Sequence, residues 1–190
     1  MAEHPAGPLT GLRSFVFAAL ALAVGALLVP RSSPAQFYPR YTSPAAASNI
    51  TIAGKKVRID YYAPSMHGRK IMGDLVPFGE VWCTGANVAT GITTDADLRI
   101  NEIKLPKGSY SLWTIPGGKE WTLIINKETK QFHLDYDPSM DFARTKMSVK
   151  KLTQPVETLR IDLRAAGDNR GVIALVWENT EASVPFTVAP

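Results

Sequence analysis

The sequence predicts an all-β protein, folded as a two-sheet antiparallel sandwich of the jelly-roll kind with about ten short strands. Three observations lead to this prediction. Short segments alternate apolar and polar residues with a period of two, Gly-, Pro- and Asn-containing turn signals separate them at short intervals, and no segment carries an apolar stripe of helical period over three turns.

The alternation is clearest in four segments, and each of them is predicted to be a strand with one buried and one solvated face. They are 57–62 (VRIDYY), 120–126 (EWTLIIN), 131–137 (QFHLDYD) and 159–164 (LRIDLR). In the third, the alternation places His133 on the solvated face.

Turn signals connect these segments. Ala53-Gly54-Lys55 is expected to join NITI to KVRIDYY as a hairpin. Further turns are predicted at Asn101-Glu102, Pro106-Lys107-Gly108, Pro116-Gly117-Gly118 and Gly167-Asp168-Asn169, the last of them before the apolar segment GVIALVWE. No internal repeat interrupts this pattern, which predicts one domain over 49–190.

The N-terminal region has the pattern of a secretory signal peptide. An apolar run over 15–29 follows Arg13 and is shorter than the roughly 20 residues that a transmembrane helix needs. Small residues near Ala35 predict cleavage there, so 1–35 is the expected signal peptide and the Pro-, Ala- and Ser-rich segment 36–48 a flexible lead-in. The expected location is periplasmic or extracellular, with no membrane span after cleavage; the alternative is an uncleaved membrane anchor.

Charge and cysteine content exclude several classes of protein. The formal net charge of +4 is too small to indicate a nucleic-acid partner, and the basic residues Lys55-Lys56, Arg69-Lys70 and Lys150-Lys151 stand as isolated pairs. Cys83 is the only cysteine, so no internal disulfide is possible and the fold must be held by its core.

Two long motifs carry a family resemblance. They are G-R-x-I-x-G-x-L-V-P-x-G-x-V-W-x-x-G-A-N over 68–87 and L-P-x-G-x-Y-S-L-x-T-I-P-G over 105–117. Through them the chain resembles a bacterial family designated domain of unknown function 2911, over about 48–188. The resemblance implies a secreted or envelope-associated protein and brings no established activity. The position after Trp82 is usually basic in this family, and here it is Cys83.

The residues give little support to catalysis or to a cofactor. His67 and His133 are far apart and no His or Cys pair has metal-ligand spacing, so no metal site is predicted. Cys83 follows Trp82 in an apolar context and is expected to be buried and inert. No G-x-S-x-G elbow and no phosphate-binding loop are present, and no cofactor is expected.

A binding site is the leading functional prediction, because aromatic, charged and amide groups concentrate in 62–87. The candidate ligand-binding residues are Tyr62, His67, Arg69, Lys70, Glu80, Trp82 and Asn87. A carbohydrate or another small polar ligand would meet the cations and the Asn87 amide and lie on Trp82 or Tyr62.

Three alternatives stay open beside the binding site. The apolar residues over 75–78 could simply close the open end of the sandwich. Glu80 with Asp60 or Asp74 could form the acid–base pair of a hydrolase. The protein could also be a structural or interaction protein of the envelope, pairing through exposed strand edges and carrying no concave polar pocket beside this segment. Oligomeric state is left open by the sequence.

Overall fold

The computed structural model describes residues 43–189, and over this range the prediction of an all-β antiparallel fold is confirmed. The predicted signal peptide over 1–35 and the lead-in up to residue 42 lie outside the described residues. The elements are β1 (Ala45–Ile52), β2 (Lys55–Tyr62), β3 (Thr90–Thr94), β4 (Leu98–Ile100), β5 (Ile103–Leu105), β6 (Gly108–Ile115), β7 (Glu120–Asn126), a 3-10 turn (Pro138–Met140), β8 (Asp141–Ala165) and β9 (Arg170–Val188). Among the residues described, no helix is long and apolar enough to cross a membrane.

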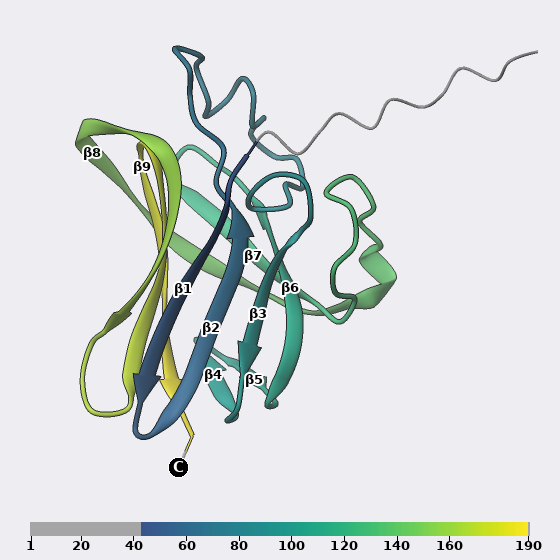
Figure 1. Cartoon of the computed structure of the whole chain (residues 1–190), viewed down its shortest axis with the longest axis vertical. Coiled ribbons are helices and arrows are strands. Elements are labelled where there is room, and N and C mark those ends of the chain that lie inside the picture. Colours follow the sequence, from purple (N-terminus) through teal and green to yellow (C-terminus); the bar gives the residue numbers. More distant parts are fainter. Residues whose placement is uncertain (1–42, 190) are drawn as a thin grey trace, which may run out of the picture. The chain divides into compact units, whose positions relative to one another are not determined.

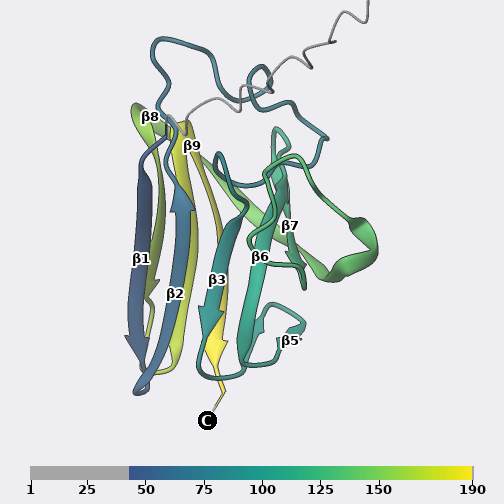
Figure 2. The same cartoon turned by 45° about the vertical axis from the view of Figure 1, so that its right-hand side comes forward.

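All nine strands belong to one antiparallel sheet, in the order β1-β2-β3-β6-β7-β8-β9-β4-β5. The sheet folds over, so that β8 and β9 lie behind the layer formed by β1, β2, β3 and β6 (Figures 1 and 2). Because hydrogen bonding runs without a break from β7 through β8 to β9, the two layers are halves of one sheet. This arrangement is compatible with the expected sandwich.

The fold-over occurs within the two long strands. The register of β8 against β9 shifts between Lys151 and Val156 and again before Arg160, and Glu178 on β9 takes a left-handed φ of 51°. Beyond this bend, β8 lies beside β1. There the Leu163 N–H donates to Ser48 Oγ at 3.0 Å, and nearby the Ile161 N–H donates to the hydroxyl of Tyr61 on β2 at 3.1 Å.

The main hydrophobic core lies between the two layers, as the period-two patterns predict. In β2, Val57 and Ile59 are 1 % and 0 % exposed, whereas Arg58 and Asp60 between and beside them form an ion pair on the solvated face. Leu175 and Trp177 of β9 belong to the same buried cluster from the opposite layer. The hairpin at Ala53-Gly54-Lys55 and the other four predicted turns are found where the sequence placed them.

A second, smaller cluster lies on the outer face of β6 and β7. Cys83, Ala89, Trp113 and Ile124 form it, and Tyr136 packs on Trp113 with ring centroids 5.0 Å apart. Since Ile124 is buried here while its neighbours in β7 face the main core, β7 is covered on both sides. The covering layer is made of loop segments rather than of another strand.

The prediction of a strand over 131–137 is wrong. This segment makes only an isolated bridge, between Phe132 and Val88, and then turns where the Asp135 N–H donates to the Phe132 carbonyl at 2.9 Å. Buried Gln131 donates through Nε2 to Ser111 Oγ at 3.0 Å, which anchors the segment over β6 by its side chain. Leu134, assigned to the buried face by the alternation, is 74 % exposed.

The long β2–β3 loop, residues 63–89, closes one end of the folded sheet. Its first part docks on β8 and β9: the Met66 N–H donates to the Glu157 carbonyl at 2.8 Å, and the carboxylate of Glu178 accepts from the N–H groups of Ile71 at 3.0 Å and Met72 at 3.1 Å. Ile71 is fully buried and Met72 nearly so, so these N–H groups depend on protein acceptors.

We expect Glu178→Ala to lower the free energy of unfolding by about 1–3 kcal/mol, because it leaves two N–H groups of buried residues without their acceptor. Urea denaturation followed by tryptophan fluorescence measures this. Glu102→Ala, in the exposed β4–β5 turn, is the control and should leave the urea midpoint unchanged. Equal midpoints for the two variants would contradict the anchoring role of Glu178.

Candidate functional site

The second part of the β2–β3 loop docks against β6 and the turn that follows it. The Gly79 N–H donates to the Pro116 carbonyl at 2.9 Å, and Trp82 forms an antiparallel bridge with Thr114 through bonds of 2.8 and 2.9 Å. The loop therefore spans from β8 and β9 to β6, and it is held at both ends by backbone hydrogen bonds.

The loop has a buried side and an exposed side. Ile71, Met72 and Val76 enter the main core, whereas Leu75 and Phe78 are 47 % and 49 % exposed. Gly73 makes the reversal between them possible: its φ is 80°, and a Cβ there would lie 2.7 Å from the Phe78 ring. The buried side closes the end of the sheet, and the exposed side is available to border a site.

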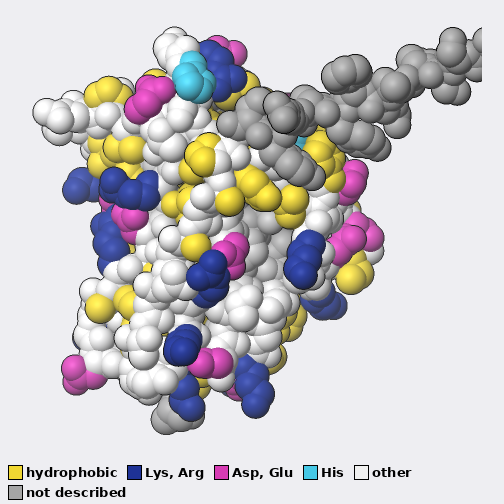
Figure 3. All heavy atoms as spheres, viewed as in Figure 1, with side chains coloured by type: hydrophobic (Ala, Val, Ile, Leu, Met, Phe, Trp, Pro, Cys, Tyr) yellow, Lys and Arg dark blue, Asp and Glu magenta, His cyan; other side chains and the backbone are white. Residues whose placement is uncertain are grey.

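A solvent-open cavity of about 430 Å³ lies beside this loop, and we call it the loop cavity. Four of the seven predicted site residues line it, namely Arg69, Glu80, Trp82 and Asn87. Its other lining residues are Ser43, Pro64, Leu75, Val76, Pro77, Val81, Cys83, Gly85, Ala86, His133, Leu134 and Trp177. Figure 3 shows apolar side chains gathered in the upper half of one face, with charged side chains of both signs above, beside and below them.

Arg69 and Glu80 bring opposite charges to the loop cavity. The guanidinium of Arg69 donates to two carbonyls of its own loop, from Nε to Met66 at 2.9 Å and from a terminal nitrogen to Ser65 at 2.8 Å. Within residues 43–189 it has no carboxylate partner, and the exposed Glu80 carboxylate has no cationic partner. Arg69 is therefore held in place by neutral acceptors, and its charge is not neutralised by a carboxylate of the described residues.

Asn87 and His133 form the next part of the wall. Asn87 has a left-handed φ of 64°, which Asn tolerates better than most residues, and its Nδ2 donates to the Ser43 carbonyl at 3.3 Å. The His133 N–H donates to the Asn87 carbonyl at 3.1 Å, which fixes the two residues side by side. Burial lowers the pKa of His133 and the nearby Asp135 carboxylate raises it by less, so the imidazole is neutral at pH 7.

Tryptophans supply the aromatic part of the wall. Trp82 is stacked on Trp177, with centroids 5.9 Å apart and planes at 22°, and it meets Trp121 edge-on at 6.2 Å. Its Nε1 donates to the Gly85 carbonyl at 3.2 Å, so its ring is fixed by packing and by a hydrogen bond. Trp177 is buried, while Trp82 is partly exposed and offers the cavity an aromatic surface.

Three predicted site residues do not line the loop cavity. Tyr62 borders a separate hollow together with Asp60 and Tyr110. His67 is exposed, and its N–H donates to the Glu157 carboxylate at 2.8 Å. Lys70 follows Arg69 in the chain but lines a different cavity, described below.

His133 also lines the loop cavity, although it was not among the residues predicted to form the site. Its place depends on the contact with Asn87, 46 positions away in the chain, and on the failure of 131–137 to form a strand. No spacing of residues within one short segment predicts such a contact. The one available signal is Pro138, which follows the segment directly and is unfavourable for continuing a strand.

Cys83 belongs to the wall of the loop cavity but is only 2 % exposed. Burial raises the pKa of its thiol to about 12, and hydrogen bonds from the backbone at Gly85 oppose this only partly. The thiol is thus protonated, packed among apolar groups and unsuited to nucleophilic attack. Among the described residues, no group of three or more His, Cys, Asp or Glu side chains could hold a metal ion.

These features define a β domain with one end closed by a long ordered loop and with a polar, tryptophan-lined cavity beside that loop. The chain belongs to the DUF2911 family, described as a protein of unknown function, whose model matches residues 43–186. Neither the comparison with curated proteins nor that with solved structures finds a match.

We expect Cys83 to resist thiol reagents in the folded protein, because its thiol is buried and its pKa is raised to about 12. At pH 8, dithionitrobenzoate should label it only after guanidinium unfolds the chain. Rapid stoichiometric labelling of the native protein would contradict the burial of this side chain.

We expect the His133 imidazole to titrate below the ordinary histidine value of about 6.5 in an NMR pH titration, because burial lowers its pKa. Asp135→Asn should lower the midpoint further, since the carboxylate favours the charged ring. A folded-state pKa below the unfolded one also means that the contribution of His133 to stability is fully present above about pH 6.5 and is lost as the pH falls through the folded-state pKa. A midpoint at or above the ordinary value would contradict this environment.

Proposed function

We propose that this protein is a non-enzymatic binding module for a small polar ligand such as a carbohydrate, and that it acts after export from a bacterial cell. One observation carries the proposal. Arg69, Glu80, Asn87 and His133 meet at one solvent-open cavity of about 430 Å³ beside Trp82, a size in the range of small-molecule sites.

The polar groups suit a ligand that carries several hydroxyls. Arg69 is a donor, the Glu80 carboxylate is an acceptor, and the Asn87 amide and the neutral His133 imidazole can each donate and accept. The hydroxyl groups of a ligand likewise donate and accept hydrogen bonds. Trp82, with the exposed Leu75, Val81 and Leu134, would cover the apolar faces of a sugar ring.

A paired-carboxylate hydrolase is less well supported. Glu80 is the one carboxylate among the described residues that lines the loop cavity. Asp60 is paired with Arg58 and borders a different hollow, and Asp74 is not part of the wall. Glycosidases require two carboxyls facing each other across the scissile bond, and this wall presents one.

A purely structural or interaction role would require no concave polar pocket beside the β2–β3 loop, and the loop cavity lies there. Export is supported by the sequence alone, through the basic residue, the short apolar run over 15–29 and the small residues near Ala35. The single, buried cysteine suits an oxidising compartment, because it leaves no exposed thiol to be oxidised.

We expect a panel of neutral, amino and acidic mono- and oligosaccharides to contain compounds that shift the amide signals of Gly85 and Asn87 and the indole signal of Trp82 in a ¹H–¹⁵N NMR spectrum. For the strongest compound, calorimetry should show that Glu80→Ala and His133→Ala each weaken binding about tenfold, since each removes a hydrogen-bonding partner that is charged or partly desolvated.

Glu102→Ala is the matched control for Glu80→Ala, because it removes an exposed carboxylate far along the chain from the cavity. It should bind as the unaltered protein does. Both site variants binding normally, or a shift pattern that leaves Gly85 and Trp82 unmoved across the whole panel, would reject the loop cavity as the site.

A further inference from the structure

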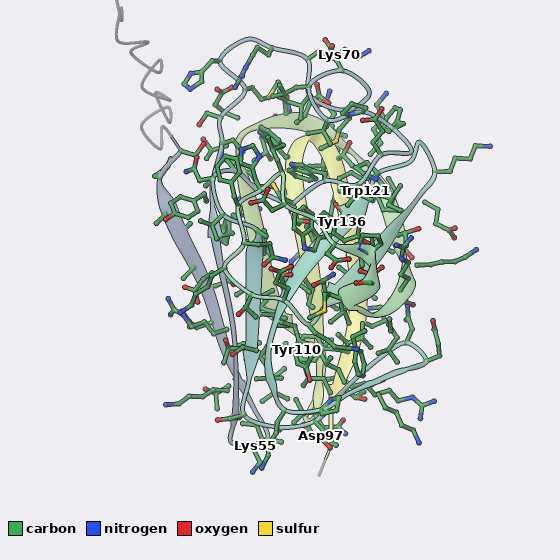
Figure 4. The ribbon with its side chains drawn as sticks, turned by 90° about the vertical axis from the view of Figure 1, so that its right-hand side faces the viewer. Lys55, Lys70, Asp97, Tyr110, Trp121 and Tyr136 are labelled. Carbon is green, nitrogen blue, oxygen red and sulfur yellow. The ribbon has the colours of Figure 1, made fainter. Side chains whose placement is uncertain are left out.

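A second cavity, of about 540 Å³, is lined by lysines, and we call it the lysine cavity. Its walls are Lys70, Gly118, Lys119, Val149, Lys150, Lys151, Glu178, Asn179 and Thr180. The lysines come from the β2–β3 loop, the β6–β7 turn and β8. The fold thus brings together lysines that lie far apart in the sequence. One of them, Lys70, lies at the end of the molecule opposite Lys55 and Asp97 (Figure 4).

The positive charge of the lysine cavity is not neutralised by the described part of the chain. None of its four lysines has a carboxylate within ion-pair distance among residues 43–189. The nearest acids along the chain and across the strands are occupied elsewhere. Glu120, next to Lys119, pairs with Lys146 at 3.1 Å, and Glu181, opposite Lys150 in the sheet, pairs with Arg164 at 2.9 Å.

Glu178 is the one acid in the wall, and its carboxylate is also engaged. Both of its oxygens accept N–H groups of the β2–β3 loop, from Ile71 and Met72. The carboxylate is therefore turned toward the loop backbone rather than toward the ammonium groups. Four lysines against one engaged carboxylate give the lining an excess of positive charge.

We propose that the lysine cavity binds a soluble oligophosphate, that is, a ligand with two or more linked phosphate groups. Lysine ammonium groups act on phosphate as compact point charges, and several of them around one hollow favour several linked anionic groups over a single one. The Asn179 amide and the Thr180 hydroxyl add neutral hydrogen-bonding groups to the same wall.

The lining also argues against other anions. It contains no aromatic side chain and no arginine, so it offers neither a stacking surface for a nucleobase nor a planar fork for carboxylates. The neighbouring residues Arg69 and Lys70 belong to different cavities: Arg69 lines the loop cavity and Lys70 lines the lysine cavity. The proposal is independent of the loop cavity and of its ligand.

The probe is inorganic tripolyphosphate. It is titrated into the full-length protein, and binding is measured by calorimetry at low and at moderate salt. The Lys119→Ala/Lys151→Ala variant should bind it at least about tenfold more weakly than the unaltered protein, and the affinity of the unaltered protein should fall as salt is raised. Both side chains are exposed and make no side-chain hydrogen bond within residues 43–189, so the melting temperature should be unchanged.

Lys55→Ala/Lys104→Ala is the matched control, since it removes the same charge from exposed positions outside the lysine cavity. It should keep the affinity within about twofold, because distant surface charges are largely screened. Equal losses in the two double variants, or no tripolyphosphate binding at low salt, would overturn the proposal. Lysine-dependent binding to vesicles of anionic phospholipid without tripolyphosphate binding would overturn it in favour of a membrane surface.

Discussion

The hydrogen bonds that Glu178 accepts from Ile71 and Met72 determine how the closed end of this molecule is organised. They join the bend of β9 to the first part of a 27-residue connection that has almost no regular structure of its own. A loop of this length would leave many backbone groups unpaired if it were merely laid over the core. Here its first part is held by β8 and β9 and its second part by β6. Residues of this docked loop line both cavities, since Arg69 belongs to the loop cavity and Lys70 to the lysine cavity.

The loop shows how one segment can close a core and form a site. Side chains that turn inward, such as Ile71 and Val76, complete the main cluster. The intervening Gly73 reverses the chain so that Leu75 and Phe78 turn outward. One segment can therefore complete the core and border a cavity, because Ile71 belongs to the core cluster and Leu75, four residues later, lines the loop cavity.

Much of the sheet was predictable because its strands are half-buried. The alternation in 57–62 and 120–126 matches β2 and β7, and the Gly- and Pro-containing turns lie between strands as expected. The segment 131–137 has the same alternation, yet the contact of Gln131 with Ser111 and the packing of Tyr136 on Trp113 hold it as a loop. The period-two pattern of 131–137 is not realised in the structure, because Gln131 is buried and Leu134 is exposed; alternation in the sequence therefore does not by itself ensure a strand.

The candidate site was predictable only where it lies within one stretch of sequence. Arg69, Glu80, Trp82 and Asn87 were found because they share the β2–β3 loop, whereas His133 and Trp177 come to the loop cavity from distant segments. The lysine cavity illustrates the same limit, since Lys70, Lys119 and Lys151 become neighbours only through the fold. Composition and net charge are averages over the whole chain, so they do not reveal a local cluster of like charges.

The contacts that fold the sheet over itself join very distant parts of the chain. Leu163 reaches Ser48 across 115 positions, Ile161 reaches Tyr61 across 100, and Ile71 reaches Glu178 across 107. Closing such long loops costs entropy before the contacts form, so topologies of this kind fold slowly. The β1–β2 hairpin can form early, but its apolar face has no opposite layer until β8 and β9 arrive. Both cavities have residues of β8 or β9 in their walls, so neither exists until these strands have docked, and a ligand of either one would bind, and stabilise, only the folded chain.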